Sequence, residues 1–146
     1  MTIHVATGDL LKCPAEAVVN TVNTEGVMGK GIALQFKRSY PDMFKAYVKA
    51  CREGRVRLGT MWLWPTAALA GPRLVINFPT KGHWRSRSRI VDIESGLVDL
   101  RRVIVEHQIS SVAVPPLGCG NGGLDWAAIR PRIVRALDGL PDVDVY

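Results

Sequence analysis

The sequence has few cysteines, no long apolar run and no low-complexity tract, and each absence excludes a class of protein. Its three cysteines, Cys13, Cys51 and Cys119, are far apart and form no CxxC pair. This argues against a disulfide framework or a zinc site and favours a reducing cytoplasm. No apolar run reaches the roughly 18 residues of a membrane span, and Met1 to Leu10 lack a signal-peptide pattern. We therefore expect a cytoplasmic globular protein.

Acidic residues are also scarcer than basic ones, 13 against 19, which leaves a formal net charge of +6. Eight of the cations lie between Lys30 and Arg57, a segment with only two acids. A second group contains four cations and no acid: Lys81, Arg85, Arg87 and Arg89. Such groups are either ordinary solvated surface or a contact for an anionic partner, such as nucleic acid or a phosphorylated ligand.

Short apolar runs rich in valine and isoleucine predict strands that are buried on both faces. The expected strands are Ile3–Thr7, Ala17–Val22, Gly59–Trp64, Arg73–Phe78, Ser111–Val114 and Val143–Tyr146. Apolar residues at helical spacing predict helices at Pro41–Cys51, Ile90–Ile104 and Trp126–Leu137, the last closed by Gly139 and Pro141.

Strands that alternate with helices predict one α/β domain over residues 1–146, with a mixed, mostly parallel sheet between two helical layers. Because the sequence stops on a strand, we expect the natural protein to continue beyond Tyr146.

Ligands of open α/β sheets bind beyond the carboxyl ends of the strands, where three unusual loops are expected. They are Thr24–Gly31, Pro79–Arg89 and Pro115–Asp125. The first and third are rich in glycine, and the third leads into a helix. Exposed backbone N–H groups and a helix N-terminus together favour binding of a diphosphate. The alternative is that both glycine loops are merely tight turns.

Neither glycine loop is a known phosphate-binding fingerprint. A P-loop ending at Lys30 requires glycine and serine or threonine where the chain has Thr24 and Gly31. A GxGxxG pattern fails in the first loop at Leu34. The match Gly118-x-Gly120-x-x-Gly123 is weak, because it follows the fifth strand and no acid ends a next strand about 20 residues on.

Five motifs, in order, resemble a macrodomain: TGDLL (7–11), VVNTVNTEGVMGKGIA (18–33), NFPTKGHWR (77–85), IESGL (93–97) and PPLGCGNGGLDW (115–126). The resemblance covers nearly the whole chain and is strongest to the branch of DNA ADP-ribosyl glycohydrolase antitoxins. It implies a three-layer α/β/α fold and metal-free, cofactor-free removal of ADP-ribose from thymidine bases of single-stranded DNA. It also implies a DarT-like toxin as partner, bound through a further C-terminal domain.

The resemblance also implies a set of ADP-ribose contacts. They are Asp9, Leu10, Asn23, Met28, Gly29, Lys30, Gly31, Ile32, Thr80, Leu117, Gly118, Cys119, Gly120, Asn121, Gly122, Gly123 and Tyr146. Gly29 to Gly31 would approach the distal ribose, and Gly118 to Gly123 would wrap the diphosphate.

Four of these positions have a second interpretation. As an acceptor-only carboxylate, Asp9 suits the adenine amine, but it also suits a helix N-cap. Asn23 suits a ribose diol or an Asx turn. Cys119 has no histidine obviously paired with it, so we interpret it as a small loop residue rather than a nucleophile. Tyr146 either stacks on adenine or packs.

Lys81 is the expected catalytic residue. A lysine in a low-dielectric cleft near Arg85 loses some preference for its charged form and becomes a nucleophile or proton carrier. The related human enzyme uses a lysine at the matching position, against C1″ of the distal ribose, and an aspartate in its second glycine loop. This chain has Asn121 in that area, so we expect a mechanism dominated by lysine. The alternative for Lys81 is a surface cation.

The residues after Lys81 are expected to contact DNA: His83, Trp84, Arg85, Arg87 and Arg89. The arginines precede a helix N-terminus, where cations are unfavourable, and a DNA backbone would account for them. Trp84 suits stacking on an unpaired base or packing in the core. The rival functions are a non-catalytic ADP-ribose-binding module and an ADP-ribose-1″-phosphate phosphatase.

Overall fold

The computed structural model describes residues 1–4, 8–68, 70–140 and 143–146. Strands and helices alternate along them: β1 (Thr2–Ile3), the 3-10 helix η1 (Leu10–Lys12), β2 (Ala17–Asn23), α1 (Gly31–Ser39), α2 (Pro41–Arg52), β3 (Trp62–Pro65), β4 (Leu74–Lys81), α3 (Ile90–Glu106), β5 (Ser111–Ala113), the 3-10 helix η2 (Gly120–Gly122), α4 (Trp126–Leu137) and β6 (Asp144–Val145).

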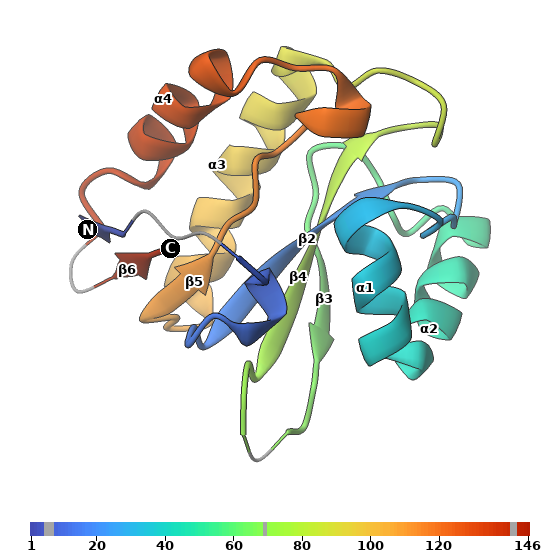
Figure 1. Cartoon of the computed structure of the whole chain (residues 1–146), viewed down its shortest axis with the longest axis horizontal. Coiled ribbons are helices and arrows are strands. Elements are labelled where there is room, and N and C mark those ends of the chain that lie inside the picture. The colour runs from blue at the N-terminus through green and yellow to red at the C-terminus, as the bar shows by residue number, and fades with distance from the viewer. Residues whose placement is uncertain (5–7, 69, 141–142) are drawn as a thin grey trace.

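The strands form one sheet in the order β1-β6-β5-β2-β4-β3. β3 runs antiparallel to β4, and the other four neighbouring pairs are parallel. The prediction of a mixed, mostly parallel sheet is therefore confirmed. Because β2, β4 and β5 point the same way, the loops that follow them leave from one edge of the sheet (Figure 1).

Two helical layers cover the sheet, α1 and α2 on one face and α3 and α4 on the other (Figure 1). Side chains of β2 alternate between them: Val18 and Val22 pack in the cluster with Phe36 and Tyr47, while Val19 packs in the cluster of α3 and α4. The predicted three-layer α/β/α fold is confirmed.

The α3 helix lies unusually close to β4. A Cβ placed on Gly96 would come within 2.4 Å of two ring atoms of Phe78. Both residues are buried. The glycine in the motif IESGL is therefore a requirement of helix-to-sheet packing.

Several predicted boundaries are wrong. The helix α1 was not predicted, and β3 begins at Trp62 rather than Gly59, whose φ of +84° belongs to a turn. β4 continues through Pro79 to Lys81, so the predicted loop 79–89 begins only at Gly82. β3 pairs with β4 only as far as Asn77, while Pro79 still pairs with Val22 of β2. Beyond Asn77 β4 is thus an edge strand, the place where a sheet admits proline.

The terminal strands are shorter than predicted. β1 covers Thr2–Ile3 and β6 covers Asp144–Val145, while β5 ends at Ala113. The remaining predicted strand residues 5–7, and Pro141 as the end of the last helix, lie outside the described residues.

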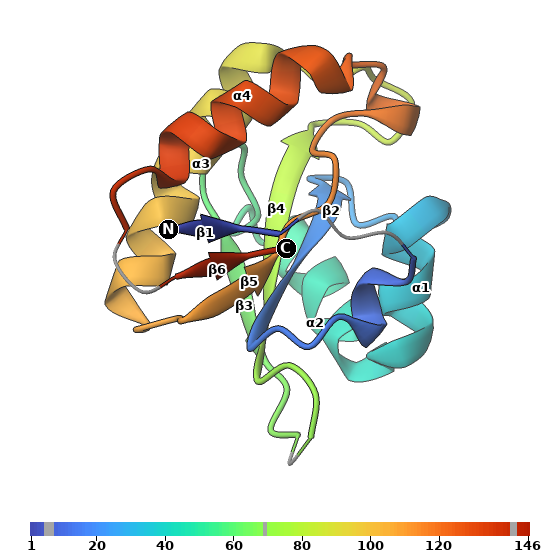
Figure 2. The same cartoon turned by 60° about the vertical axis from the view of Figure 1, so that its left-hand side comes forward.

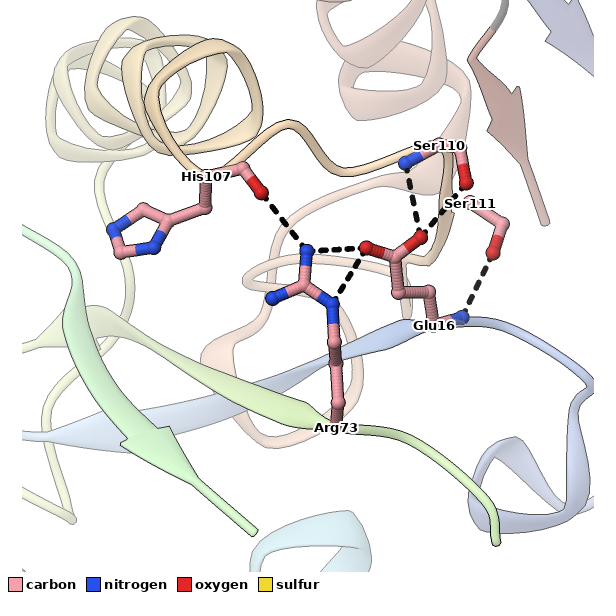
Figure 3. A network of polar contacts seen from close by, with 5 residues as sticks. All are labelled: Glu16, Arg73, His107, Ser110 and Ser111. Carbon is pink, nitrogen blue, oxygen red and sulfur yellow. Dashed lines mark hydrogen bonds and ion pairs between the residues drawn. The ribbon is translucent and has the colours of Figure 1, made fainter. Parts of the chain in front are cut away.

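At the opposite edge of the sheet, a polar network joins the starts of β2, β4 and β5 (Figure 3). Arg73 Nε donates to Glu16 Oε1 at 2.7 Å and Arg73 Nη2 donates to the His107 carbonyl at 2.8 Å, while Ser110 Oγ donates to Glu16 Oε2 at 2.7 Å. Burial opposes ionisation of Glu16, but the hydrogen bonds from Ser110 and Arg73 outweigh it and lower the pKa of Glu16. This network anchors the end of the sheet away from the glycine loops.

The described residues contain neither a candidate membrane-spanning helix nor a candidate metal cluster. None of their helices is both long and apolar enough to cross a bilayer. Nor do the histidine, cysteine, aspartate and glutamate residues within these ranges gather into a group of three or more that suits a metal ion.

Candidate functional site

Hydrogen bonds join the three loops at the carboxyl ends of β2, β4 and β5. The amide and hydroxyl of Thr24 donate to the Gly82 carbonyl at 3.2 and 2.8 Å. The amide of Ser88 donates to the Gly122 carbonyl at 2.9 Å. The loops that the sequence placed at one edge of the sheet therefore form one continuous surface.

Asn23 organises the first loop. Its Oδ1 accepts from the amides of Glu25 and Val27 at 3.0 and 3.3 Å and lies 3.0 Å from the Tyr47 hydroxyl, while its Nδ2 donates to the Val27 carbonyl at 2.8 Å. The Asx-turn interpretation is thus confirmed. Burial raises the pKa of Tyr47, so its hydroxyl remains a donor. A contact between Asn23 and the distal ribose stays a prediction. In that contact the second N–H of Asn23 Nδ2 would be the donor.

The start of α1 supplies backbone rather than side chains to the site. Gly31 is its first residue and has a φ of +58°, which favours glycine. Lys30 is the N-cap and makes no side-chain capping bond, so the positive end of the helix dipole lies beside an exposed cation. Met28 is buried in the core, at 1% exposure of the whole residue, and its contact with ADP-ribose stays a prediction.

A groove of about 1030 Å³ brings together four predicted contacts, Asp9, Leu10, Ile32 and Tyr146. Asp9 Oδ1 accepts from the Leu11 amide at 3.0 Å and caps η1, which leaves Oδ2 outside this cap. The Tyr146 ring stacks on His4, with centroids 4.7 Å apart and planes inclined by 15°, so one face of the ring is covered. Arg38 adds a cation to the groove.

The second glycine loop is held largely by its own hydrogen bonds. The amides of Cys119, Gly122, Gly123 and Leu124 donate to carbonyls within residues 116–120. Among the described residues, the amides of Gly118 and Gly120 have no such partner. Fewer N–H groups therefore remain for a diphosphate than the glycine pattern suggested.

Gly118 shows why this loop needs glycine. Its φ is +72°, and a Cβ there would lie 2.7 Å from Leu124 Cδ1. Leu117 and Thr80 are buried as whole residues, at 0% and 4% exposure, and their ligand contacts stay predictions.

Cys119 has the environment of an unreactive thiol. Burial, and then the nearby Asp125 carboxylate, raise the pKa of Cys119. The thiolate is the nucleophilic form, so these surroundings support the interpretation of Cys119 as a small loop residue.

Lys81 is the last residue of β4, in register with Asn23 of β2, and is half-buried. Burial, and then the charge of Lys30, lower the pKa of Lys81. We predicted Arg85 as the neighbouring cation, and Lys30 acts instead. Nothing in a single sequence indicates this pair, because Lys30 precedes α1 and Lys81 ends β4, and only the folded chain brings them near each other.

The loop after Lys81 exposes its aromatic and basic side chains. Trp84 is 38% exposed, so its interpretation as a core residue is wrong. It stacks on His83, with centroids 5.5 Å apart, and the Arg85 guanidinium lies 4.4 Å from the centroid of its ring. Arg87 lies against the glycine loop, its Cγ and Cδ 3.8 Å from where a Gly123 Cβ would be. Arg89 is the N-cap of α3.

The sequence model of the macro domain matches residues 19–133. The chain belongs to the macrodomain family. A curated relative, the DNA ADP-ribosyl glycohydrolase of Mycobacterium tuberculosis, is 60% identical over 142 residues, which are 97% of this chain and 40% of that protein. This macrodomain therefore spans 40% of the length of that relative.

Solved structures agree with the family assignment. The macrodomain of Mycobacterium tuberculosis DarG superimposes with a TM-score of 0.97 and 59% identity, covering 99% of this chain and 95% of the other. Thermosipho africanus DarTG, solved in complex with ADP-ribose, gives a TM-score of 0.91 and 33% identity over 99% of this chain and 41% of its own. A Thermosipho africanus relative, 38% identical over 95% of this chain and 40% of its own length, is a DNA ADP-ribosyl transferase–DNA ADP-ribosyl glycohydrolase fusion protein.

Proposed function

We propose that this macrodomain removes ADP-ribose from thymidine bases of single-stranded DNA, as the antitoxin to a DNA ADP-ribosyltransferase toxin. The observation that carries the proposal is Lys81: a half-buried lysine of lowered pKa at the end of β4, followed by a loop that hydrogen-bonds to both glycine loops. The name of the Mycobacterium tuberculosis relative supports the reaction. The Thermosipho africanus complex supports ADP-ribose as the ligand.

In this proposal the ligand extends from the groove to Lys81. Adenine lies in the groove beside Asp9, the diphosphate lies at Gly118 and Gly120, and the distal ribose lies near Lys30 and Lys81. The Lys81 amine attacks C1″, the bond from C1″ to the thymidine base breaks, and the base takes up the proton. Water then cleaves the C1″–Nζ bond, which releases ADP-ribose and restores the lysine.

The direct test uses two substrates. An ADP-ribosylated single-stranded oligonucleotide and an ADP-ribosylated glutamate peptide are incubated separately with the protein, and released ADP-ribose is measured. We expect release from the oligonucleotide. ADP-ribose binding without release from either substrate would support a binding module. ADP-ribose-1″-phosphate is incubated in a separate assay, and release of phosphate from it would support a phosphatase.

The proposed partner is a DarT-like toxin, and the fusion relative supports this pairing. Co-expression tests it in cells. A cell that makes such a toxin should stop growing, and the macrodomain should restore growth if removal of the DNA mark is sufficient.

The pH dependence should reveal the influence of Lys30 on Lys81. If the neutral amine attacks, the rate rises with pH through the pKa of Lys81. Lys30→Gln removes a like charge, raises the pKa of Lys81 and should move this rising limb to higher pH. Lys37→Gln is the matched control, because that ammonium lies 4.3 Å from the Phe44 ring centroid. Equal profiles for wild type and Lys30→Gln would contradict the assigned coupling.

Asp9→Ala should weaken ADP-ribose binding by roughly 1–3 kcal/mol, the range for a hydrogen bond to a charged group. Asp9→Asn is the matched control, because asparagine also caps a helix and retains an oxygen for the Leu11 amide. Both variants should lose affinity by calorimetry if the carboxylate accepts from adenine. An Asn variant that binds normally would assign Asp9 to capping alone, and equal wild-type affinity for GDP-ribose would remove the adenine assignment.

The exposed arginines should hold the DNA strand. Replacing Arg85 and Arg89 with alanine should lower activity on a long oligonucleotide and reduce its salt slope by about 0.7 for each phosphate that an arginine no longer neutralises. Activity on an ADP-ribosylated mononucleotide should barely change. Arg87→Ala is the comparison, because its contact with the glycine loop should make it affect both substrates. Equal losses on both substrates from the Arg85 and Arg89 changes would make those arginines structural.

A further inference from the structure

Ser88 joins the loop that follows Lys81 to the second glycine loop. Its amide donates to the Gly122 carbonyl at 2.9 Å, and its side chain packs directly beneath the glycines. A Cβ on Gly122 would lie 2.5 Å from Ser88 Oγ and 3.1 Å from Ser88 Cβ, and a Cβ on Gly118 would lie 3.1 Å from Ser88 Cβ. The glycines at 118 and 122 thus make room for Ser88 as well as for a turn.

The hydroxyl of Ser88 is buried and lacks a hydrogen-bond partner, whereas most buried polar side chains of the described residues have one. Ser88 is 5% exposed, and its Oγ has no hydrogen-bond partner within the described part of the chain. A buried hydroxyl without a hydrogen-bond partner destabilises the folded protein. Stability of the free protein therefore does not explain a serine at this position, since alanine would pack equally well without that cost.

We propose that Ser88 is a positioning residue for the reaction. Its amide and Cβ fix the glycine loop relative to Lys81. Its hydroxyl gains an acceptor, a phosphate oxygen or a glycine-loop carbonyl, when the loop closes on the diphosphate. The proposal rests on the proposed function, because it assigns Gly118 to Gly123 to the diphosphate and Lys81 to C1″.

The physical reason is the length of the ligand. A diphosphate held by the glycine loop places the distal ribose at a fixed distance, so a shift of this loop moves C1″ away from the amine. A misplacement of about 1 Å costs about 10²-fold in rate. Ser88 lies on the loop that directly follows Lys81, seven positions along the chain, and contacts the glycine loop directly, so a shift of the glycine loop relative to Lys81 must pass through this contact.

Ser88→Ala tests the hydroxyl. Without ligand, the Ser88→Ala variant should unfold at the same or a higher urea concentration than wild type, because it loses an unsatisfied hydroxyl. It should nevertheless bind ADP-ribose at least threefold more weakly. If Ser88 were only structural, the variant should lose both stability and affinity for ADP-ribose. Ser95→Ala is the control, since the exposed Ser95 hydroxyl already donates to the Val91 carbonyl at 3.0 Å. Wild-type affinity in Ser88→Ala would overturn the role of the hydroxyl.

Gly122→Ala, alone and with Ser88→Gly, tests the relative position of the loops. Gly122 does not have a positive φ, and the three atoms nearest to an added Cβ all belong to Ser88, so alanine there should act by pushing against Ser88. We expect kcat on the ADP-ribosylated oligonucleotide to fall at least tenfold in Gly122→Ala, with less change in KM. The double variant should recover to within threefold of Ser88→Gly.

A double variant as slow as Gly122→Ala would overturn the positioning role. Turnover and ADP-ribose binding of the wild type are measured first. They separate a failure of the proposed hydrolase function from a failure of the role proposed for Ser88. A wild type that binds but does not cleave would refute the proposed hydrolase. In that case, the ADP-ribose affinities of Gly122→Ala, Ser88→Gly and the double variant still test the role of Ser88.

Discussion

Lys81→Ala is expected to slow the removal of ADP-ribose from thymidine by about 10²-fold or more, the contribution of a positioned proton-transfer group. The binding of ADP-ribose should change little. Asp9, Asn23 and both glycine loops keep their hydrogen bonds without the lysine side chain, which accepts and donates none of those bonds. Single-turnover release of ADP-ribose and calorimetry measure the two quantities on the same preparation.

Lys81→Arg separates charge from chemistry. Arginine keeps the positive charge but cannot lose its proton at accessible pH. It should be as slow as alanine if the neutral amine reacts. Arginine turnover near that of wild type would reduce Lys81 to an electrostatic role. Full activity in the alanine variant would move the chemistry to another residue, with His83 the next candidate.

Gly96→Ala is expected to lower the free energy of unfolding by about 1–3 kcal/mol, the usual cost of overpacking a core. Helix propensity alone predicts the opposite, a gain of about 1 kcal/mol for alanine over glycine. Packing should win because the new Cβ would lie 2.4 Å from the Phe78 ring, so α3 must move away from β4. Urea unfolding monitored by circular dichroism measures the change.

The reason for this loss can be checked with a second substitution. Phe78→Leu makes space above Gly96, so Gly96→Ala should cost less in that background than in wild type. A measured coupling near zero would show that the helix does not press on this ring. Ser95→Ala, on the exposed side of the same helix, should change stability by no more than about 0.5 kcal/mol.

Elements with clear apolar periodicity were the predictable part of the fold. The helix starting at Pro41, the α3 stripe and the α4 stripe all appear within a few residues of their predicted bounds. The α1 helix escaped prediction because it begins at a glycine and buries only Phe36 fully. The end of β4 was not predicted because a proline such as Pro79 usually ends a strand. Only the register of β3 on β4 shows that β3 no longer pairs there.

The candidate site also has a part that the sequence predicts and a part that it does not. Strand order brings residues after strand ends together, so the loops and Lys81 were placed correctly from the sequence. What the side chains do there depends on three-dimensional contacts. Asn23 holds its own loop, the Lys30 charge acts on Lys81, and Ser88 packs beneath Gly122. Residue spacing contains no information on such contacts. The individual ADP-ribose and DNA contacts remain predictions.

The neighbouring places of β1 and β6 in the sheet affect when the protein becomes functional during translation. β1 pairs with β6, Thr2 opposite Asp144, and β6 pairs with β5 (Figure 2). A nascent chain on the ribosome therefore cannot seat its first strand until residues 144–145 have emerged. Asp9 and Tyr146 both line the groove, so Lys81 and both glycine loops are synthesised before the groove is complete. A partly made chain therefore contains Lys81 and both glycine loops but lacks one wall of the groove.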